Sequence, residues 1–250
     1  MTVNFERIMG VLAVLLAIGI GYILRGSAQE VPVVISNSQF HVTILTKNTI
    51  EILENTTQKR TKRRFDFPIA TIELCPTSPY LSLHADDTWF TSYLYHFHEQ
   101  TLFSAPMSHS DAGRWSSDGH YTILYAGINL AIVPTEQLLA YLPLSEVSQQ
   151  PEIVINGHEF GMMAPLAWID EHTLLYETGC CDLAVYGVVD LSQGKNYFVA
   201  WCASSIGICE KTHDLAFFQT YVQEQLQQQT LQEVSFDFMN DVFALQKQNK

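Results

Sequence analysis

The sequence predicts an all-β domain that follows an N-terminal hydrophobic helix. Short strand-like segments recur between turn-forming residues, an acidic turn recurs in front of several of them, and an uncharged run opens the chain. Apolar residues make up 47% of the 250 positions and charged residues 16%. This composition is sufficient for a sizeable core and is unlike that of a disordered chain.

The N-terminal residues determine the expected location. Residues 8–24 carry no charge, and as a helix they would span about 25 Å, slightly less than a hydrocarbon core of about 30 Å. Small residues at 26–28 would allow cleavage after Ala28. We expect residues 1–29 to be a signal anchor, with a cleaved signal peptide as the alternative. Residues 30–250 would then be the extracytoplasmic domain of a single-pass membrane protein.

Charge is unevenly distributed along the chain. The formal net charge is −13, with a net +4 in residues 1–64 and −17 in residues 65–250. The overall negative charge argues against nucleic acid as a partner, since phosphate binding needs cations. The basic run of residues 59–64 allows two interpretations. Cations on an exposed strand discourage edge-to-edge pairing, or they contact anionic lipid headgroups or an acidic polymer near the membrane.

The domain shows strand patterns almost throughout. Five segments are rich in β-branched and aromatic residues that alternate roughly with other residues, and they are bounded by Gly, Pro, Asn, Asp or Ser. These segments are residues 41–45, 49–53, 89–93, 121–125 and 185–189. Strand–turn–strand pairs are expected around residues 55–58, 99–101, 134–137 and 191–195. Beyond the N-terminus, helix is plausible only in the Gln-rich residues 219–232.

An internal repeat is the strongest signal. Each copy places an acidic turn directly before a strand, and the copies occupy residues 84–93, 115–125, 168–176 and 209–218. With about 40–45 residues per blade, residues 40–250 allow four to five blades of a small β-propeller. A β-sandwich is the alternative architecture.

Two segments carry a resemblance to a known family. Trp115-Ser116-Ser117-Asp118-Gly119, followed by Ile123-Leu124-Tyr125, resembles the W-S-P-D-G-x-x-I-x-Y signature of TolB-like, WD-related β-propeller repeats. Residues 188–195 resemble the V-x-D-L-x-T-G-K hairpin of the same repeat. The resemblance implies that the tryptophans pack between blades and that Asp and Gly form the turns. The corresponding residues are Trp115, Asp118, Gly119, Trp168, Asp190 and Gly194.

Histidines offer weak candidates for chemistry. His96 and His98 would share one face of a strand and could hold a metal with His84, His109 or Asp111. A chance pair is the simpler interpretation, so we expect neither a metal nor a cofactor. His120, His172 and His213 recur after the acidic turns, where they either satisfy the turn backbone or respond to external pH.

Carboxylates also recur on successive turns. They are Asp86, Asp87, Asp111, Asp118, Asp170, Glu171 and Asp182. Two carboxylates at a suitable separation could hydrolyse a glycoside, although turn formation alone explains Asp at such positions. The sequence has no G-x-S-x-G, H-E-x-x-H, Walker or dinucleotide motif.

Four of the five cysteines lie close together. They are Cys180, Cys181, Cys202 and Cys209, and none has C-x-x-C spacing. In an oxidising compartment, Cys180 or Cys181 could bridge to Cys202 or Cys209. Reduced, buried cysteine is the alternative.

These observations predict a membrane-anchored, non-catalytic module that binds an envelope protein or glycan. The alternative is an extracytoplasmic hydrolase that acts on glycan or peptide through its turn carboxylates. A third hypothesis is a structural protein that completes its propeller with another copy.

Overall fold

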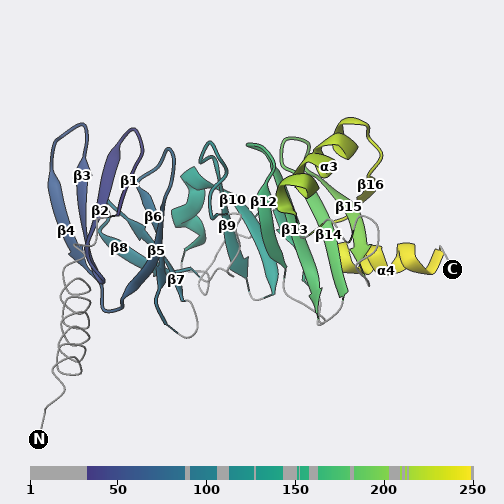
Figure 1. Ribbon diagram of the computed structural model, residues 1–250, viewed down its shortest axis with the longest axis horizontal. Helices are drawn as coiled ribbons and strands as arrows, with labels where there is room; N and C mark the ends of the chain where they lie inside the picture. Colours follow the sequence, from purple (N-terminus) through teal and green to yellow (C-terminus); the bar gives the residue numbers. More distant parts are fainter. Residues whose placement is uncertain are drawn as a thin grey trace, which may run out of the picture. The chain divides into compact units, whose positions relative to one another are not determined.

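The fold is all-β, as the sequence predicts. A computed structural model describes residues 33–87, 91–105, 113–126, 128–142, 151, 153–157, 163–180, 183–202, 209, 212 and 214–248. These residues form four antiparallel sheets that follow one another in chain order, with few helices (Figure 1). Residues Val34–Lys250 form one compact unit.

The predicted membrane run, residues 8–24, lies outside the described residues. In the part of the chain that the structure describes, no helix has both the length and the hydrophobicity needed to cross a bilayer.

The first two sheets each contain four strands in sequence order. The first sheet contains β1 (Val34–Ser36), β2 (Phe40–Thr46), β3 (Thr49–Glu54) and β4 (Arg60–Arg64). The second contains β5 (Ile69–Leu74), β6 (Tyr80–Ala85), β7 (Ser92–His96) and β8 (Thr101–Ser104).

The third and fourth sheets depart slightly from this pattern. The third contains β9 (Tyr121–Ala126), β10 (Asn129–Pro134) and β11 (Ile153–Ile155). Trp115 adds an isolated antiparallel bridge to Thr122 of β9. The fourth sheet contains β12 (Ala164–Trp168), β13 (Thr173–Cys180), β14 (Leu183–Asp190), β15 (Lys195–Cys202) and β16 (Gln232–Val234).

Most predicted strands are confirmed. Residues 41–45, 49–53, 121–125 and 185–189 lie within β2, β3, β9 and β14. The segment 89–93 extends into undescribed residues, and β7 begins at Ser92.

The hairpin predicted around residues 134–137 is wrong, because the chain enters the 3-10 helix η1 (Thr135–Tyr141) instead. Leu138 and Tyr141, three residues apart, both enter the core on one side of this helix, which fits its period of three residues per turn.

The repeat copy predicted at residues 209–218 is also wrong. Helix α3 (Leu215–Gln227) occupies this part of the chain, and Asp214 begins it. The Asp214 carboxylate accepts a hydrogen bond from the Phe217 amide at 3.1 Å, so Asp214 acts as an N-cap and not as a strand-preceding turn. Phe218 and Val222, four residues apart, are then buried on the same side of α3.

A separate hydrophobic core lies between each pair of successive sheets. One cluster joins residues of the first and second sheets, the next joins the second and third, and a third joins the third and fourth with α4 (Phe238–Gln248). A fourth cluster seats α3 on the other face of the fourth sheet. Strand pairing stays within each sheet, so contact between sheets depends mainly on side chains. A few backbone hydrogen bonds add to it, such as that from the Ile69 amide to the Lys47 carbonyl.

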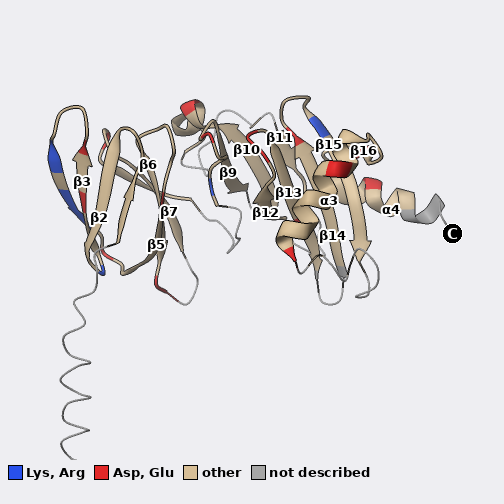
Figure 2. Cartoon of the chain, turned by 45° about the horizontal axis from the view of Figure 1, so that its top comes forward, with Lys and Arg blue, Asp and Glu red and all other residues tan. Residues whose placement is uncertain are grey.

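Cations concentrate on β4, the edge strand of the first sheet (Figure 2). Arg60, Lys62 and Arg64 are exposed, and they alternate with two half-buried residues. One of these, Arg63, lies over the Tyr95 ring at 5.7 Å from its centroid. The strand thus presents three cations on one face.

A fully buried arginine connects the second and third sheets. Arg114 donates hydrogen bonds to Ser82 Oγ at 3.0 Å, to the Ala105 carbonyl at 2.7 Å and to the Ile123 carbonyl at 3.3 Å. Glu73 of β5 accepts the Arg114 amide at 2.8 Å. Burial lowers the pKa of Arg114 to about 10, so the guanidinium stays charged at neutral pH.

The carboxyl of Glu73 binds the backbone amides of Arg114 and Trp115, and the Arg114 charge also acts on it. Burial raises the pKa of Glu73, while hydrogen bonds from the Arg114 and Trp115 amides and the Arg114 charge oppose that rise. The arrangement satisfies the buried charge with directional bonds to three different segments, so it fixes how the two sheets meet.

Replacement of Arg114 should therefore destabilise the domain strongly. We expect Arg114→Met to lower the free energy of unfolding by about 3–5 kcal/mol, since it leaves Glu73 buried beside unpartnered acceptors. The matched control, Arg64→Met on the exposed edge, should change it by less than about 0.5 kcal/mol. Urea denaturation followed by tryptophan fluorescence measures both. Equal losses for the two variants would contradict the assigned role.

Candidate functional site

The turn before β9 is fixed by bonds within a few residues. Asp118 Oδ1 accepts the Ser116 hydroxyl at 2.7 Å and the His120 amide at 3.0 Å, while Ser116 Oγ accepts the Tyr121 amide at 3.0 Å. Gly119 has φ +75°, and a Cβ there would lie 2.7 Å from Thr77 Oγ1. The turn thus needs glycine for its backbone conformation and for its close approach to the preceding sheet.

The same aspartate geometry recurs in two other predicted turns. Asp170 Oδ1 accepts the His172 amide at 2.8 Å, and Asp190 Oδ1 accepts the Ser192 amide at 2.9 Å. Each is an Asx-turn, in which the side chain bonds the backbone two residues later. Gly194 closes the turn after Asp190 with φ +64° and has open space around it, so only its backbone conformation favours glycine there.

The two repeat tryptophans occupy equivalent places between sheets. Trp115 is buried in the core shared by the second and third sheets, and Trp168 packs against the core shared by the third and fourth. The indole Nε1 of each is buried and has no hydrogen-bond partner among the described residues.

A hollow of about 450 Å³ opens where the turns of three successive sheets meet. The second sheet contributes the β5–β6 turn, the third contributes the Asp118 turn and the start of η1, and the fourth contributes the turn before β13. The lining residues are Thr77, Ser78, Gly119, His120, Tyr121, Pro134, Thr135, Glu136 and His172.

Two histidines line this hollow, and Asp118 lies beside one of them. The Tyr121 ring packs edge-on against His172, with centroids 5.9 Å apart, and His120 Nε2 lies 3.9 Å from Asp118 Oδ2. Partial burial acts to raise the pKa of Asp118. Hydrogen bonds from the His120 amide and the Ser116 hydroxyl lower it, as do the charges of His120 and His172, and the net effect is a lowered pKa. The hollow therefore presents two exposed imidazoles, and the ionised Asp118 carboxylate lies beside His120. His213, the third histidine of the series, lies outside the described residues.

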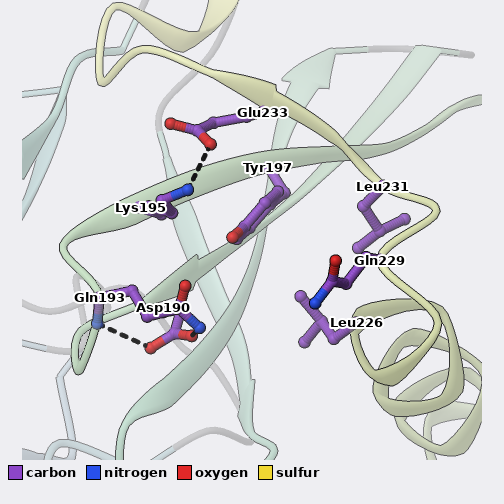
Figure 3. Close-up of a pocket in the computed structure, with 8 residues that line it drawn as sticks. All are labelled: Asp190, Gln193, Lys195, Tyr197, Leu226, Gln229, Leu231 and Glu233. Atoms are coloured by element: carbon purple, nitrogen blue, oxygen red, sulfur yellow. Dashed lines mark hydrogen bonds and ion pairs between the residues drawn. The ribbon is translucent and has the colours of Figure 1, made fainter.

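A second hollow, of about 310 Å³, lies between the fourth sheet and the end of α3 (Figure 3). On one side Lys195 Nζ pairs with Glu233 Oε2 at 2.8 Å, and Gln193 Nε2 donates to Asp190 Oδ2 at 2.7 Å. Leu226, Gln229 and Leu231 form the other side. Its charged groups already bind one another and join β16 to β15, so this hollow is the weaker candidate.

The weak metal candidates, His96 and His98, lie at the end of β7. Their rings are 5.9 Å apart, but His96 is buried and its Nδ1 accepts the Glu99 amide at 3.1 Å. Burial and the neighbouring His98 lower the pKa of His96, while Glu99 opposes this. Of the other proposed ligands, His84 Nδ1 shares a hydrogen bond with Ser92 Oγ, and His109 and Asp111 lie outside the described residues. Within the described ranges, no three His, Cys, Asp or Glu side chains are placed to hold a metal ion.

The structure pairs Cys202 with Cys209 in a disulfide. Both cysteines belong to the four expected to form disulfides, although the bridge joins them to each other and not to Cys180 or Cys181. Cys181 and the side chain of Cys180 lie outside the described residues. Cys75 is a free, buried thiol whose pKa is raised by burial.

Several turn carboxylates are engaged in their own turns. Besides Asp118, Asp170 and Asp190, Asp87 accepts both the amide and the hydroxyl of Thr91 at 3.0 and 2.7 Å. Asp111 and Asp182 lie outside the described residues.

Sequence reasoning missed Thr77, Ser78 and Glu136 as hollow residues, as well as the Glu73–Arg114 pair. Thr77 and Ser78 precede the turn by about forty positions, and no local pattern connects them to it. The histidine after each aspartate was the available signal, because it placed His120 and His172 at equivalent turns.

Comparison with known proteins gives only distant likenesses. No protein-family model and no curated protein matches the chain. Kluyveromyces lactis Hsv2 is similar at 12% identity and a TM-score of 0.36, over 67% of this chain and 58% of that one. A eukaryotic initiation factor is similar at 9% identity and a TM-score of 0.42, over 65% of this chain and 41% of that one. The chain thus spans less than two thirds of either length, and these TM-scores carry no argument about function.

Substitution of Asp118 should separate the turn's geometry from its charge. Asp118→Ala removes the Asx-turn acceptor and should lower the free energy of unfolding at neutral pH by about 1–2 kcal/mol. Asp118→Asn keeps an acceptor oxygen and should lower the free energy of unfolding by less.

The charge of Asp118 should make part of the stability depend on pH. Because the folded pKa of Asp118 is lowered, its ionic contribution to stability is present above the unfolded pKa of about 3.9 and is lost as pH falls through the folded value. Stability measured between about pH 2 and pH 7 should therefore decline less on acidification in Asp118→Asn than in the wild type. Parallel profiles would contradict this.

Proposed function

We propose that the protein is a membrane-anchored, extracytoplasmic, β-propeller-like module that binds a protein partner without catalysis. The single observation that carries the proposal is the hollow at which turns from three successive sheets converge. Propeller-type folds use loops gathered at one end of their sheets to bind partners, and the resemblance of the repeat to TolB-like blades supports the same use here.

The chemistry of the hollow suits recognition of a polar partner. His120, His172 and Glu136 are exposed at its rim, while Gly119 and Thr135 are buried in its lining. The side chains thus combine hydrogen-bond donors, acceptors and a negative charge on a backbone fixed by Asx-turns. Such a preorganised surface loses little conformational entropy on binding.

Two observations support an extracytoplasmic location. The uncharged residues 8–24 have the composition of a membrane segment, and the Cys202–Cys209 disulfide is typical of an oxidising compartment.

Site-specific photo-crosslinking in the native membrane tests partner binding. A photoreactive residue replaces either His120 or His172 in the full chain, and the matched control replaces Gln223, which is exposed on α3. We expect one protein adduct from both hollow positions and none from Gln223. The double variant His120→Ala, His172→Ala should lower co-purification of that protein by at least about tenfold, the effect of removing an interface hot spot.

Adducts of equal yield from all three positions, or none from the hollow, would contradict partner binding there. A polysaccharide adduct in place of a protein would favour the glycan alternative, and release of shortened glycan by the purified chain would favour the hydrolase.

A further inference from the structure

We propose that the outer face of the first sheet, centred on the cations of β4, docks on the surface of an anionic bilayer. We call this surface the basic face, and it comprises the outward side chains of β1 to β4. The occupant is the headgroup layer of a membrane rich in negatively charged lipid. The proposal goes beyond partner binding at the hollow, although one step of it rests on the membrane segment in the proposed function.

The strand register defines the basic face. Phe40, Val42, Ile50 and Ile52 point into the core between the first two sheets, so the alternate residues point away from it. Arg60, Lys62 and Arg64 of β4 lie on the outward side and are exposed. Two rows of cross-strand neighbours run across the face. One consists of Val34, Thr43, Glu51 and Lys62, and the next consists of His41, Leu53 and Arg60.

Most of the positive charge on this face is free to bind an external anion. Arg60 pairs with Glu51 at 2.8 Å. Lys62 and Arg64 take part in none of the salt bridges found among the described residues. Lys47, in the turn between β2 and β3, is also exposed. Two cations of the edge strand β4 and one in the β2–β3 turn are therefore exposed and form no salt bridge with another described residue. Residues 65–250 are strongly acidic.

Apolar side chains accompany these cations. Val34 is 54% exposed and Leu45 is 42% exposed. A surface that combines cations with exposed aliphatic side chains suits the interface of an anionic membrane, where cations bind headgroups and apolar groups reach the acyl boundary.

Edge protection alone does not account for this arrangement. Cations placed anywhere on an edge strand discourage pairing with another strand, whereas here the exposed Val34 lies on the same face and the exposed Leu45 lies in the bulge near the end of β2. The outer face of the fourth sheet is covered by α3, while no described element covers the outer face of the first. Among the described residues, the first sheet therefore has an uncovered outer face, whereas the fourth does not.

The chain's own connectivity would bring this face to a membrane. Val34 lies ten positions after Leu24, the end of the uncharged run, so β1 would begin within about 35 Å of the bilayer surface. Residues 65–250 carry a net −17, and an anionic surface would repel them while attracting the basic face.

Photo-crosslinking to lipid tests the proposal with the full chain. A photoreactive residue replaces Leu45 or, as the control position, Gln223, and the protein is reconstituted into vesicles of phosphatidylcholine alone or with about one third phosphatidylserine. We expect phosphatidylserine to raise the yield of lipid adduct at position 45 by at least about tenfold, given roughly fivefold per cation. Sodium chloride at about 1 M, where the Debye length is about 3 Å, should abolish the increase. Position 223 should give no adduct with either lipid.

Two charge-matched variants complete the test. The triple variant Arg60→Gln, Lys62→Gln, Arg64→Gln should lose the phosphatidylserine effect. The control variant is Gln223→Glu, Gln227→Glu, Gln228→Glu, made with the probe at position 45. It lowers the net charge by the same amount, at exposed residues near the end of α3 and its C-cap, and should keep the phosphatidylserine effect. Equal yields with both lipids, or an unchanged triple variant, would overturn the proposal. The absence of lipid adducts would also overturn it, and that result is expected if β4 binds an acidic polymer and not lipid.

Alkaline extraction of the same vesicles separates this proposal from the membrane segment. Chain that resists extraction but shows no phosphatidylserine effect would overturn the basic face and leave the anchor standing. Chain that is extracted but still crosslinks through position 45 only with phosphatidylserine would support the basic face and overturn the anchor.

Discussion

The relation between the second and third sheets depends on the buried guanidinium of Arg114. Strand pairing stays within each sheet, and hydrophobic contact between sheets has little directional preference. Arg114 supplies that direction, because its donors bind β6, the chain after β8 and β9 simultaneously. Glu73 then accepts the amides of Arg114 and Trp115, which places the tryptophan between the sheets. The turn that begins at Ser116, and so the position of His120, follows from this anchoring.

Features governed by short-range bonds could be predicted from the sequence. The Asp118 turn uses donors and acceptors within five residues, and its strand, β9, is rich in β-branched and aromatic residues. The Glu73–Arg114 pair could not be predicted, because 41 residues separate its members and neither belongs to a recognisable motif. The error at residues 209–218 has a different cause. An aspartate before an apolar run fits both an Asx-turn and a helix N-cap, and Phe218 and Val222 decide for the helix by burying one face of α3 against the fourth sheet.

Single residues of the hollow could be predicted from the sequence, but the hollow itself could not. The histidines could be assigned to equivalent turns, but the β5–β6 turn and η1 approach them only after three sheets have packed together. The replacement of a predicted hairpin by η1 matters here, because that helix starts at Thr135 and Glu136, two of the lining residues. The site thus depends on a departure from the repeat as much as on the repeat itself.

Hydrogen bonds between successive turns connect the first sheet to this hollow. Asn37, in the turn between β1 and β2, donates to the Cys75 carbonyl at 2.7 Å, and Gln39 of the same turn donates to the Thr77 carbonyl at 3.2 Å. Thr77 in turn lies against Gly119, where a Cβ would not fit. The turns of three sheets are therefore fixed to one another before any ligand arrives. Because these turns do not need to reorganise, binding energy at the hollow can be used for selectivity between partners. That property suits a recognition module better than a site that must close around a substrate.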